Sequence, residues 1–149
     1  MRNEILERDL GEWEAAVTVF AGPGAPATSI GHLSARLVAG GNWLVLDYLN
    51  PMSGFGGHGV YGWDEAAGHF VGTWVDNLTA TLRILKGTHD PETGAVTYVG
   101  EIDGPQGRME LRQRTVAPEP DVRRFTSTII LPDGKEFVVM EAIYRRSVA

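Results

Sequence analysis

The chain has 149 residues, of which 43% are hydrophobic and 21% are charged, with 19 glycines, 8 prolines and no cysteine. This length and composition predict one globular domain over residues 1–149 and argue against disorder. The net charge of −6 disfavours a nucleic-acid or anionic-membrane partner, and the lack of cysteine excludes disulfides and thiolate metal sites. Because no window resembles a signal peptide or a membrane span, we expect a cytoplasmic protein.

The first ten residues predict a short helical segment, with Ile5, Leu6 and Leu10 on its apolar side. A helix of this size must dock on another element, because it is not stable alone. Residues 12–19 then alternate between apolar and polar types, which is the pattern of a half-buried strand. The following Gly- and Pro-rich stretch, residues 21–26, is a candidate lid or portal, with an ordinary surface connection as the alternative.

Nine further strands are predicted at Ile30–Ala39, Asn42–Asn50, Gly57–Asp64, His69–Asp76, Thr79–Gly87, Ala95–Ile102, Arg108–Val116, Arg123–Leu131 and Glu136–Arg146. Turn residues separate them, and Gly40-Gly41 predicts a two-residue hairpin. No crossover helix intervenes, so the sequence predicts an all-β, antiparallel up-and-down barrel of about ten strands. A two-sheet sandwich is the structural alternative, and the uniformly short connections disfavour it.

Three features resemble the calycin group, the lipocalins and fatty-acid-binding proteins. They are Gly11-Glu12-Trp13 after a short helical lead-in, the meander of strands, and Arg146 near the end of the last strand. In that group an arginine of the closing strand lies across the first-strand tryptophan at the closed end of the barrel. The resemblance therefore implies a structural pair of Trp13 and Arg146, with Arg145 as the alternative partner, and such stacking is favourable.

More narrowly, the chain resembles a bacterial, lipocalin-like family of uncharacterised proteins, domain of unknown function 1579. The matching motifs are Gly11-x-Trp13, Gly22-Pro23-Gly24, Gly40-Gly41-x-Trp43-Leu44, Gly59-x-x-Gly62-x-Asp64, Gly72-Thr73-Trp74-x-Asp76, Gly87-x-x-Asp90 and Tyr144-x-Arg146. Their order covers nearly the whole chain. The family has no established activity, so this resemblance supports the fold and adds little about function.

Paired aromatic and polar residues are the candidate ligand contacts. Tyr61 and Trp63 share one face of their strand, and Trp74 and Asp76 share one face of the next. An inward face of this kind would supply the aromatic walls and polar tips that small-ligand pockets use. The alternative is that the rings fill the core and Asp76 caps the following turn.

Asp47 and Tyr48 lie on opposite faces of one strand, so at most one of them points inward. Tyr48 is the better pocket candidate, because its ring can be buried while its hydroxyl meets a ligand. The predicted ligand-binding residues are Tyr48, Tyr61, Trp63, Trp74 and Asp76.

The four histidines show no metal-ligand spacing, so no metal site is predicted. His58, in a glycine-rich stretch, is a weak catalytic candidate together with Asp76, since an inward acid and base would need to meet within hydrogen-bond reach. Haem on an inward histidine is an alternative that only the fold favours, and no cofactor is predicted.

Three functions remain open at this point. The leading one is an intracellular binding protein that holds a small hydrophobic molecule in the barrel. The second is a small barrel enzyme, of isomerase or hydrolase type, that uses the inward pair of His58 and Asp76. The third is a filled barrel that acts as an interaction module, most simply a homodimer.

Overall fold

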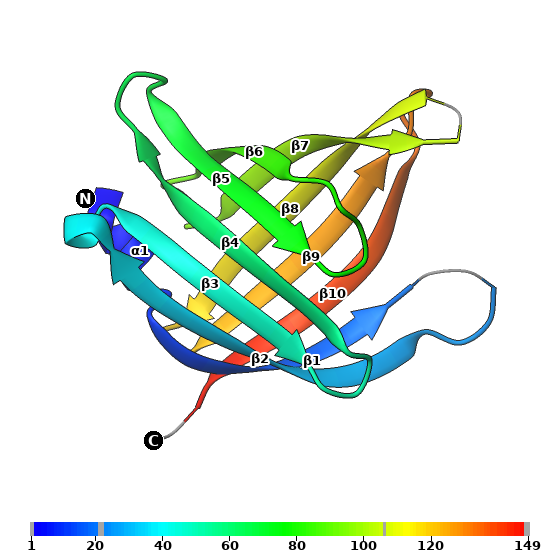
Figure 1. Cartoon of the computed structure of the whole chain (residues 1–149), viewed down its shortest axis with the longest axis horizontal. Coiled ribbons are helices and arrows are strands. Elements are labelled where there is room, and N and C mark those ends of the chain that lie inside the picture. The colour runs from blue at the N-terminus through cyan, green and yellow to red at the C-terminus, as the bar shows by residue number, and fades with distance from the viewer. Residues whose placement is uncertain (1, 21–22, 106, 148–149) are drawn as a thin grey trace.

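The computed structural model describes residues 2–20, 23–105 and 107–147, and Figure 1 shows its course. Its elements are α1 Arg2–Glu7, β1 Gly11–Val19, β2 Ala27–Val38, the 3₁₀ turn η1 Ala39–Gly41, β3 Trp43–Asn50, β4 Phe55–Asp64, β5 His69–Asp76, β6 Arg83–His89, β7 Val96–Gly104, β8 Gly107–Glu119, β9 Val122–Ile130 and β10 Glu136–Arg146. Within these described ranges, no helix has the length and apolar character needed to cross a membrane.

The ten strands form one closed antiparallel barrel in chain order, and β10 closes it by pairing with β1. The closing register places Trp13 opposite Arg146 and Val19 opposite Met140. Closure leaves no strand edge unpaired around the ring, which is how short meandering strands avoid exposing backbone hydrogen-bonding groups. The predicted all-β barrel with a short N-terminal helix is confirmed.

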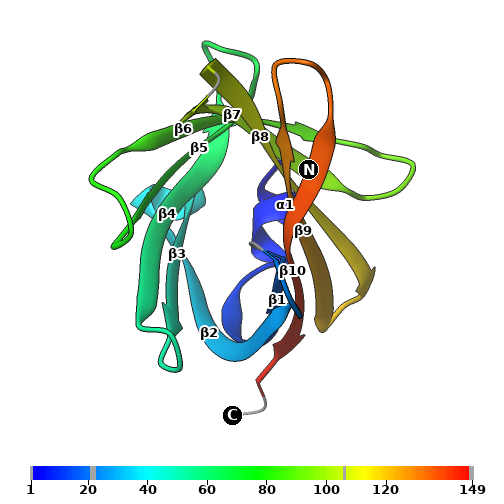
Figure 2. The ribbon, with the colours of Figure 1, turned by 90° about the vertical axis from the view of Figure 1, so that its right-hand side faces the viewer.

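Helix α1 closes one end of the barrel, within the ring of strands (Figure 2). Its Leu6 is buried against Ala35, Leu44 and Phe70, and this apolar contact supplies the docking that so short a helix needs. We call this the closed end. The opposite end, where β1 ends and β2 begins, is the open end.

Several strand boundaries differ from the predicted ones. Strand β2 begins at Ala27 instead of Ile30, because Ala27 to Ser29 already pair with β1. Strand β6 begins at Arg83 instead of Thr79. Strand β8 continues to Glu119, past Val116, through a register shift that accommodates the proline of this segment. Ala21 and Gly22 of the expected lid lie outside the described residues.

The predicted two-residue hairpin at Gly40-Gly41 is wrong in length. The connection is η1 and Asn42, although both glycines have the expected positive φ, 72° and 85°. Ala39 also has a positive φ, 52°, and the backbone carbonyl of Ala39 accepts hydrogen bonds from the backbone and side chain of Asn42. These bonds make a wider turn than a tight hairpin.

Candidate functional site

Strand register decides which side chains point into the barrel. Trp13, Ala15 and Val17 of β1 are buried, whereas Glu12 and Glu14 between them are exposed. Directly opposed residues face the same side of a sheet, so the pairs carry this orientation around the ring. It places all five predicted ligand-binding residues, Tyr48, Tyr61, Trp63, Trp74 and Asp76, on the inner face.

Aromatic rings lie directly on inward-facing glycines of neighbouring strands. A Cβ added to Gly31 would lie 2.2 Å from the Tyr48 hydroxyl, and one added to Gly57 would lie 2.0 Å from the Trp74 indole. Tyr61 covers Gly72 in the same way, at 2.4 Å. Glycine therefore allows each ring to lie flat on the wall, so the wall is aromatic without the rings standing across the interior.

The four tyrosines of the sequence form a group inside the barrel. The rings of Tyr61 and Tyr98 meet edge to face, with their centroids 5.0 Å apart. Tyr48 and Tyr144 pack in the same apolar cluster around Ala15, Val17 and Ala142. Burial raises the pKa of Tyr61, Tyr98 and Tyr144 far above the ordinary value of a phenol, and nearby tyrosines raise those of Tyr98 and Tyr144 further. The tyrosines therefore stay protonated at neutral pH.

At the open end, Trp74 and Asp76 form a bonded pair on β5. The indole Nε1 donates to Asp76 Oδ2 at 3.0 Å, while Asp76 Oδ1 accepts from the backbone N–H groups of Leu78 and Thr79. Both carboxylate oxygens are therefore occupied in fixing the indole and the following turn. This arrangement gives Asp76 the turn-capping role that was the alternative at this position.

Space accessible to solvent remains inside the barrel. Tyr48, Trp74, Tyr98 and Tyr144 all point inward, yet each is only partly buried. In a barrel filled by its own side chains, these four inward residues would be enclosed on every side. Their residual exposure indicates an interior with room next to the aromatic wall.

The open end carries an apolar rim. The large apolar side chains that are exposed gather on strands and turns toward this end: Phe20, Ile30, Leu49, Met52, Val75, Leu78, Leu82, Ile84, Phe137 and Val138. On β6 Ile84 is 70% exposed while Leu85 is enclosed, so Leu85 faces the interior and Ile84 faces outward. An apolar molecule thus meets apolar surface at the entrance.

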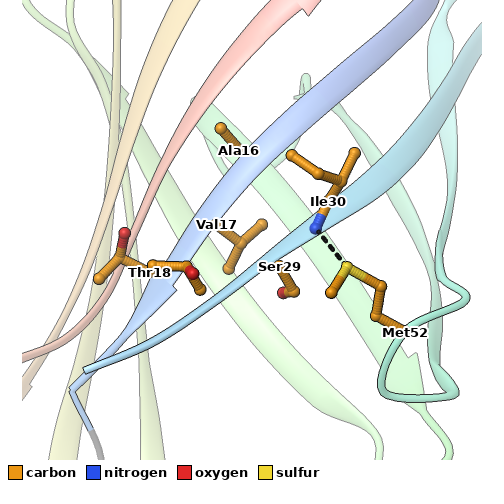
Figure 3. A pocket seen from close by; sticks show the side chains of 7 residues that line it. Ala16, Val17, Thr18, Ser29, Ile30 and Met52 are labelled. Carbon is orange, nitrogen blue, oxygen red and sulfur yellow. Dashed lines mark hydrogen bonds between the residues drawn. The ribbon is translucent and has the colours of Figure 1, made fainter. Parts of the chain in front are cut away.

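Two shallow pockets lie at this rim. One, of about 220 Å³, is lined by Ala16, Val17, Thr18, Thr28, Ser29, Ile30 and Met52. Figure 3 shows Met52 reaching over the start of β2, where its sulfur accepts the Ile30 N–H at 3.4 Å. The other, of about 200 Å³, lies between the β7–β8 and β9–β10 turns. Most residues of the first pocket, among them Ala16, Thr18 and Ile30, belong to the outer face of β1 and β2, so this pocket lies on the outside of the wall near the open end.

The closed end is held by two arginines around Trp13. The guanidinium carbon of Arg146 lies 4.2 Å from the Trp13 ring centroid, and that of Arg123 lies 5.0 Å from it. Arg123, 5% exposed, donates to Asp9 Oδ1 at 2.7 Å and to the backbone carbonyls of Arg8, Glu119, Pro120 and Val122. Arg123 therefore ties β9 to the segment after α1.

Arg8 lies beside this cluster and is the least satisfied cation of the closed end. Its Nη1 donates to the carbonyl of Gly94 at 2.9 Å, and its Nε lies 3.7 Å from Asp9 Oδ1. Among the described residues, its Nε and Nη2 are enclosed without a hydrogen bond. Burial lowers the pKa of Arg8, and Asp9 partly offsets this effect.

The structure does not bring His58 and Asp76 together. His58 lies on the outer face, where its Nδ1 is 2.6 Å from Asp47 Oδ1, and Arg36 donates to the other oxygen of Asp47 at 2.8 Å. The hydrogen bond with His58, and then that with Arg36, lowers the pKa of Asp47. Because the wall separates His58 from Asp76, the inward acid–base pair is not formed. The described residues also contain no group of His, Asp or Glu that could hold a metal ion.

Sequence reasoning missed Tyr98, Tyr144 and Arg123. Tyr144 is in phase with Arg146 on β10, so the expected position of Arg146 could have placed it inside. Tyr98 gave no such signal, because its neighbours Thr97, Val99 and Gly100 do not alternate clearly.

The comparisons with known proteins support the fold. A family model described as "Protein of unknown function (DUF1579)" matches residues 2–146. A search of curated proteins gave no match. The S-type phycobiliprotein lyase CPES from Guillardia theta is 14% identical, with a TM-score of 0.55 and coverage of 98% of this chain and 92% of the lyase. This likeness shows a shared fold.

Two further solved structures are similar at lower scores. A redesigned β barrel is 16% identical, with a TM-score of 0.42 and coverage of 99% of this chain and 96% of that chain. A protein of unknown function from the DUF3598 family of Nostoc punctiforme is 9% identical, with a TM-score of 0.30 and coverage of 99% of both chains.

Proposed function

The chain belongs to the DUF1579 family, whose description gives no activity, and we propose from its interior that it binds one small, largely apolar molecule inside the barrel. The observation that carries the proposal is the inward aromatic wall of Tyr48, Trp74 and Tyr144, which closure of the barrel does not fully bury. Burying an apolar ligand against such a wall is favourable in proportion to the apolar area removed from water. Barrels of this strand number are about wide enough for one such molecule.

The architecture also supports a lipocalin-like assignment within the calycin group. Trp13 follows Gly11 at the start of β1, and Arg146 of the closing strand stacks on it. The closed end and the apolar rim then give the barrel a floor and an entrance. In this assignment Trp13 and Arg146 are structural residues, and the binding residues lie between the two ends.

A fluorescence titration with 1-aminoanthracene, an uncharged aromatic probe, tests this function. We expect the probe to brighten on binding with one-to-one stoichiometry, and to quench the emission of Trp74 by energy transfer. The quenching should fall strongly in Trp74→Phe and persist in Trp43→Phe, because Trp43 packs over Gly62 on the outer face. Brightening with unchanged quenching in Trp74→Phe would place the probe elsewhere, and no brightening at all would contradict binding.

A further inference from the structure

Four tyrosine side chains point into the barrel. Tyr48 comes from β3, Tyr61 from β4, Tyr98 from β7 and Tyr144 from β10, so the four rings reach inward from different parts of the wall. They account for every tyrosine in the chain. Tyr61 meets Tyr98 edge to face, and Tyr144 lies close enough to Tyr48 and Tyr61 for their charges to affect its ionisation.

Three of these hydroxyls have no partner among the described residues. Asn50 Nδ2 donates to the Tyr48 hydroxyl at 3.4 Å, whereas the hydroxyls of Tyr61, Tyr98 and Tyr144 take part in no hydrogen bond. None of these three hydroxyls is among the fully enclosed polar atoms that lack a hydrogen bond in the described residues, so each keeps contact with the space inside the barrel. They are therefore donors that are free to bond to a molecule held there.

The charged side chains of the inner wall lie toward its two ends. On the described strands, tyrosines apart, they are Asp76 and Arg83 toward the open end and His89, Arg123 and Arg146 toward the closed end. Arg8 and Asp9, between α1 and β1, also lie close enough to Tyr98 to affect the pKa of its phenol, and Asp9 acts on it more strongly than Arg8 does. An anion beside Tyr98 would therefore lose its hydration and meet the carboxylate of Asp9 as well as the guanidinium of Arg8.

Building on the proposed function, we propose that the ligand is an uncharged, flat molecule with at least one carbonyl-type acceptor, bound by the hydroxyls of Tyr61, Tyr98 and Tyr144. A protonated phenol is a good hydrogen-bond donor, and an aromatic wall around it favours a flat apolar body. The unpartnered hydroxyls thus select for an acceptor within an apolar frame. A site that holds donors ready for an acceptor discriminates against an analogue that lacks it.

Displacement of bound 1-aminoanthracene by two compounds of nearly equal shape tests this selectivity. Fluorenone carries a carbonyl group, and fluorene has a methylene group in its place. We expect fluorenone to compete about 2- to 12-fold more strongly for each hydrogen bond formed. Fluorene-9-carboxylate, which is charged, should compete more weakly than either. Equal competition by fluorenone and fluorene, or preference for the carboxylate, would overturn the proposed ligand class while leaving the binding function intact.

Tyr61→Phe and Tyr144→Phe test the role of the hydroxyls, because each removes one oxygen and keeps the ring. We expect each variant to bind fluorenone less tightly, so that its preference for fluorenone over fluorene falls. The affinity for fluorene should stay the same. The melting temperature of the empty protein should not fall, because the hydroxyl that is removed bonds to no other described residue. Tyr48→Phe is the matched control: it removes a partnered hydroxyl, so its melting temperature should not rise.

The two proposals fail in different ways. If 1-aminoanthracene does not bind the unaltered protein, the binding function itself is wrong. If it binds and the Tyr→Phe variants keep the full preference for fluorenone, another group recognises the carbonyl and the tyrosine site is wrong. A clear fall in the melting temperature of Tyr61→Phe and Tyr144→Phe would assign their hydroxyls to structure and would also contradict the inference.

Discussion

Inward glycines and aromatic rings form complementary pairs along the wall. Gly31 lies under Tyr48, Gly57 under Trp74, and Gly72 under Tyr61. Each ring covers backbone that has no side chain of its own, which buries apolar ring area and leaves the centre of the barrel less crowded. At this scale the glycines of the inner wall are as important to the candidate site as the aromatic residues that cover them.

Gly57→Ala tests this pairing. The added Cβ would lie 2.0 Å from the Trp74 ring, so the indole must move and lose its hydrogen bond to Asp76. We expect a loss of about 1–3 kcal/mol in the free energy of unfolding and altered Trp74 emission. Chemical denaturation with fluorescence measures both.

Gly56→Ala is the matched control for that substitution. Its added Cβ would be 3.6 Å from the nearest atom, the Tyr48 carbonyl oxygen, which is ordinary contact. It should therefore change stability far less. Equal losses of stability in the two variants would show that packing against Trp74 is not the reason for a glycine at position 57.

The same glycines explain why the sequence could not predict which side chains of β4 face the interior. Between Phe55 and Tyr61 the inward positions 57 and 59 are glycines, so no apolar side chain marks the inner face of this part of the strand. The sequence around His58 therefore does not distinguish the inner face from the outer one. On β1, where Trp13, Ala15 and Val17 alternate with polar residues, the inner face was readable from the sequence alone.

At the scale of elements, the closed end joins segments that are far apart in the sequence. Arg123 of β9 bonds to Asp9 after α1, and Arg146 of β10 bonds to the carbonyls of Arg8 and Leu10. The Trp13 indole donates to the carbonyl of Asp9 at 3.0 Å. The short helix is therefore fixed both by Leu6 in the core and by polar contacts to the last two strands.

Arg123→Ala tests the polar part of this closure. It would leave Asp9 and several partly buried carbonyls without their donor, so we expect a loss of about 3–5 kcal/mol in the free energy of unfolding. Arg124→Ala is the control, because the neighbouring side chain is exposed and should change stability by less than about 0.5 kcal/mol. Similar denaturation midpoints for the two variants would contradict the assigned role of Arg123.

Hairpins were more predictable than strand ends. Asp64 and Asp90 cap their turns by accepting N–H bonds from Ala67 and Glu92, as turn-forming residues do. The start of β2 at Ala27 could not be inferred, since Ala and Ser do not favour strands and Thr28 alone is a weak signal; the pairing with β1 orders this segment. Arg123 was missed because its neighbour Arg124 made the pair look like a solvated charge cluster.

For the whole molecule, the tyrosine group predicts a limit of stability in alkali. The folded-state pKa values of Tyr61, Tyr98 and Tyr144 lie above 10, whereas those of tyrosines in the unfolded chain lie near 10. Above pH 10 the unfolded state therefore holds fewer protons, and stability falls as the pH rises. Below pH 10 this contribution is fully present.

The expected slope is about 1.4 kcal/mol per pH unit for each of these three tyrosines. Tyrosinate absorbance should consequently appear together with unfolding, and Tyr144→Phe should reduce the slope by one residue's share. Absorbance and circular dichroism followed over pH 9–12 measure this. Ionisation of all tyrosines near pH 10 in a still-folded barrel would contradict the buried arrangement.

A closed barrel that keeps a usable space beside its aromatic wall should hold a small molecule there. Native mass spectrometry of the protein, as purified and after incubation with fluorenone, measures this. We expect a one-to-one adduct that disappears in the denatured mass, either with a co-purified molecule or with fluorenone. Only the mass of the bare chain under both conditions would contradict it, and would indicate a barrel filled by its own side chains.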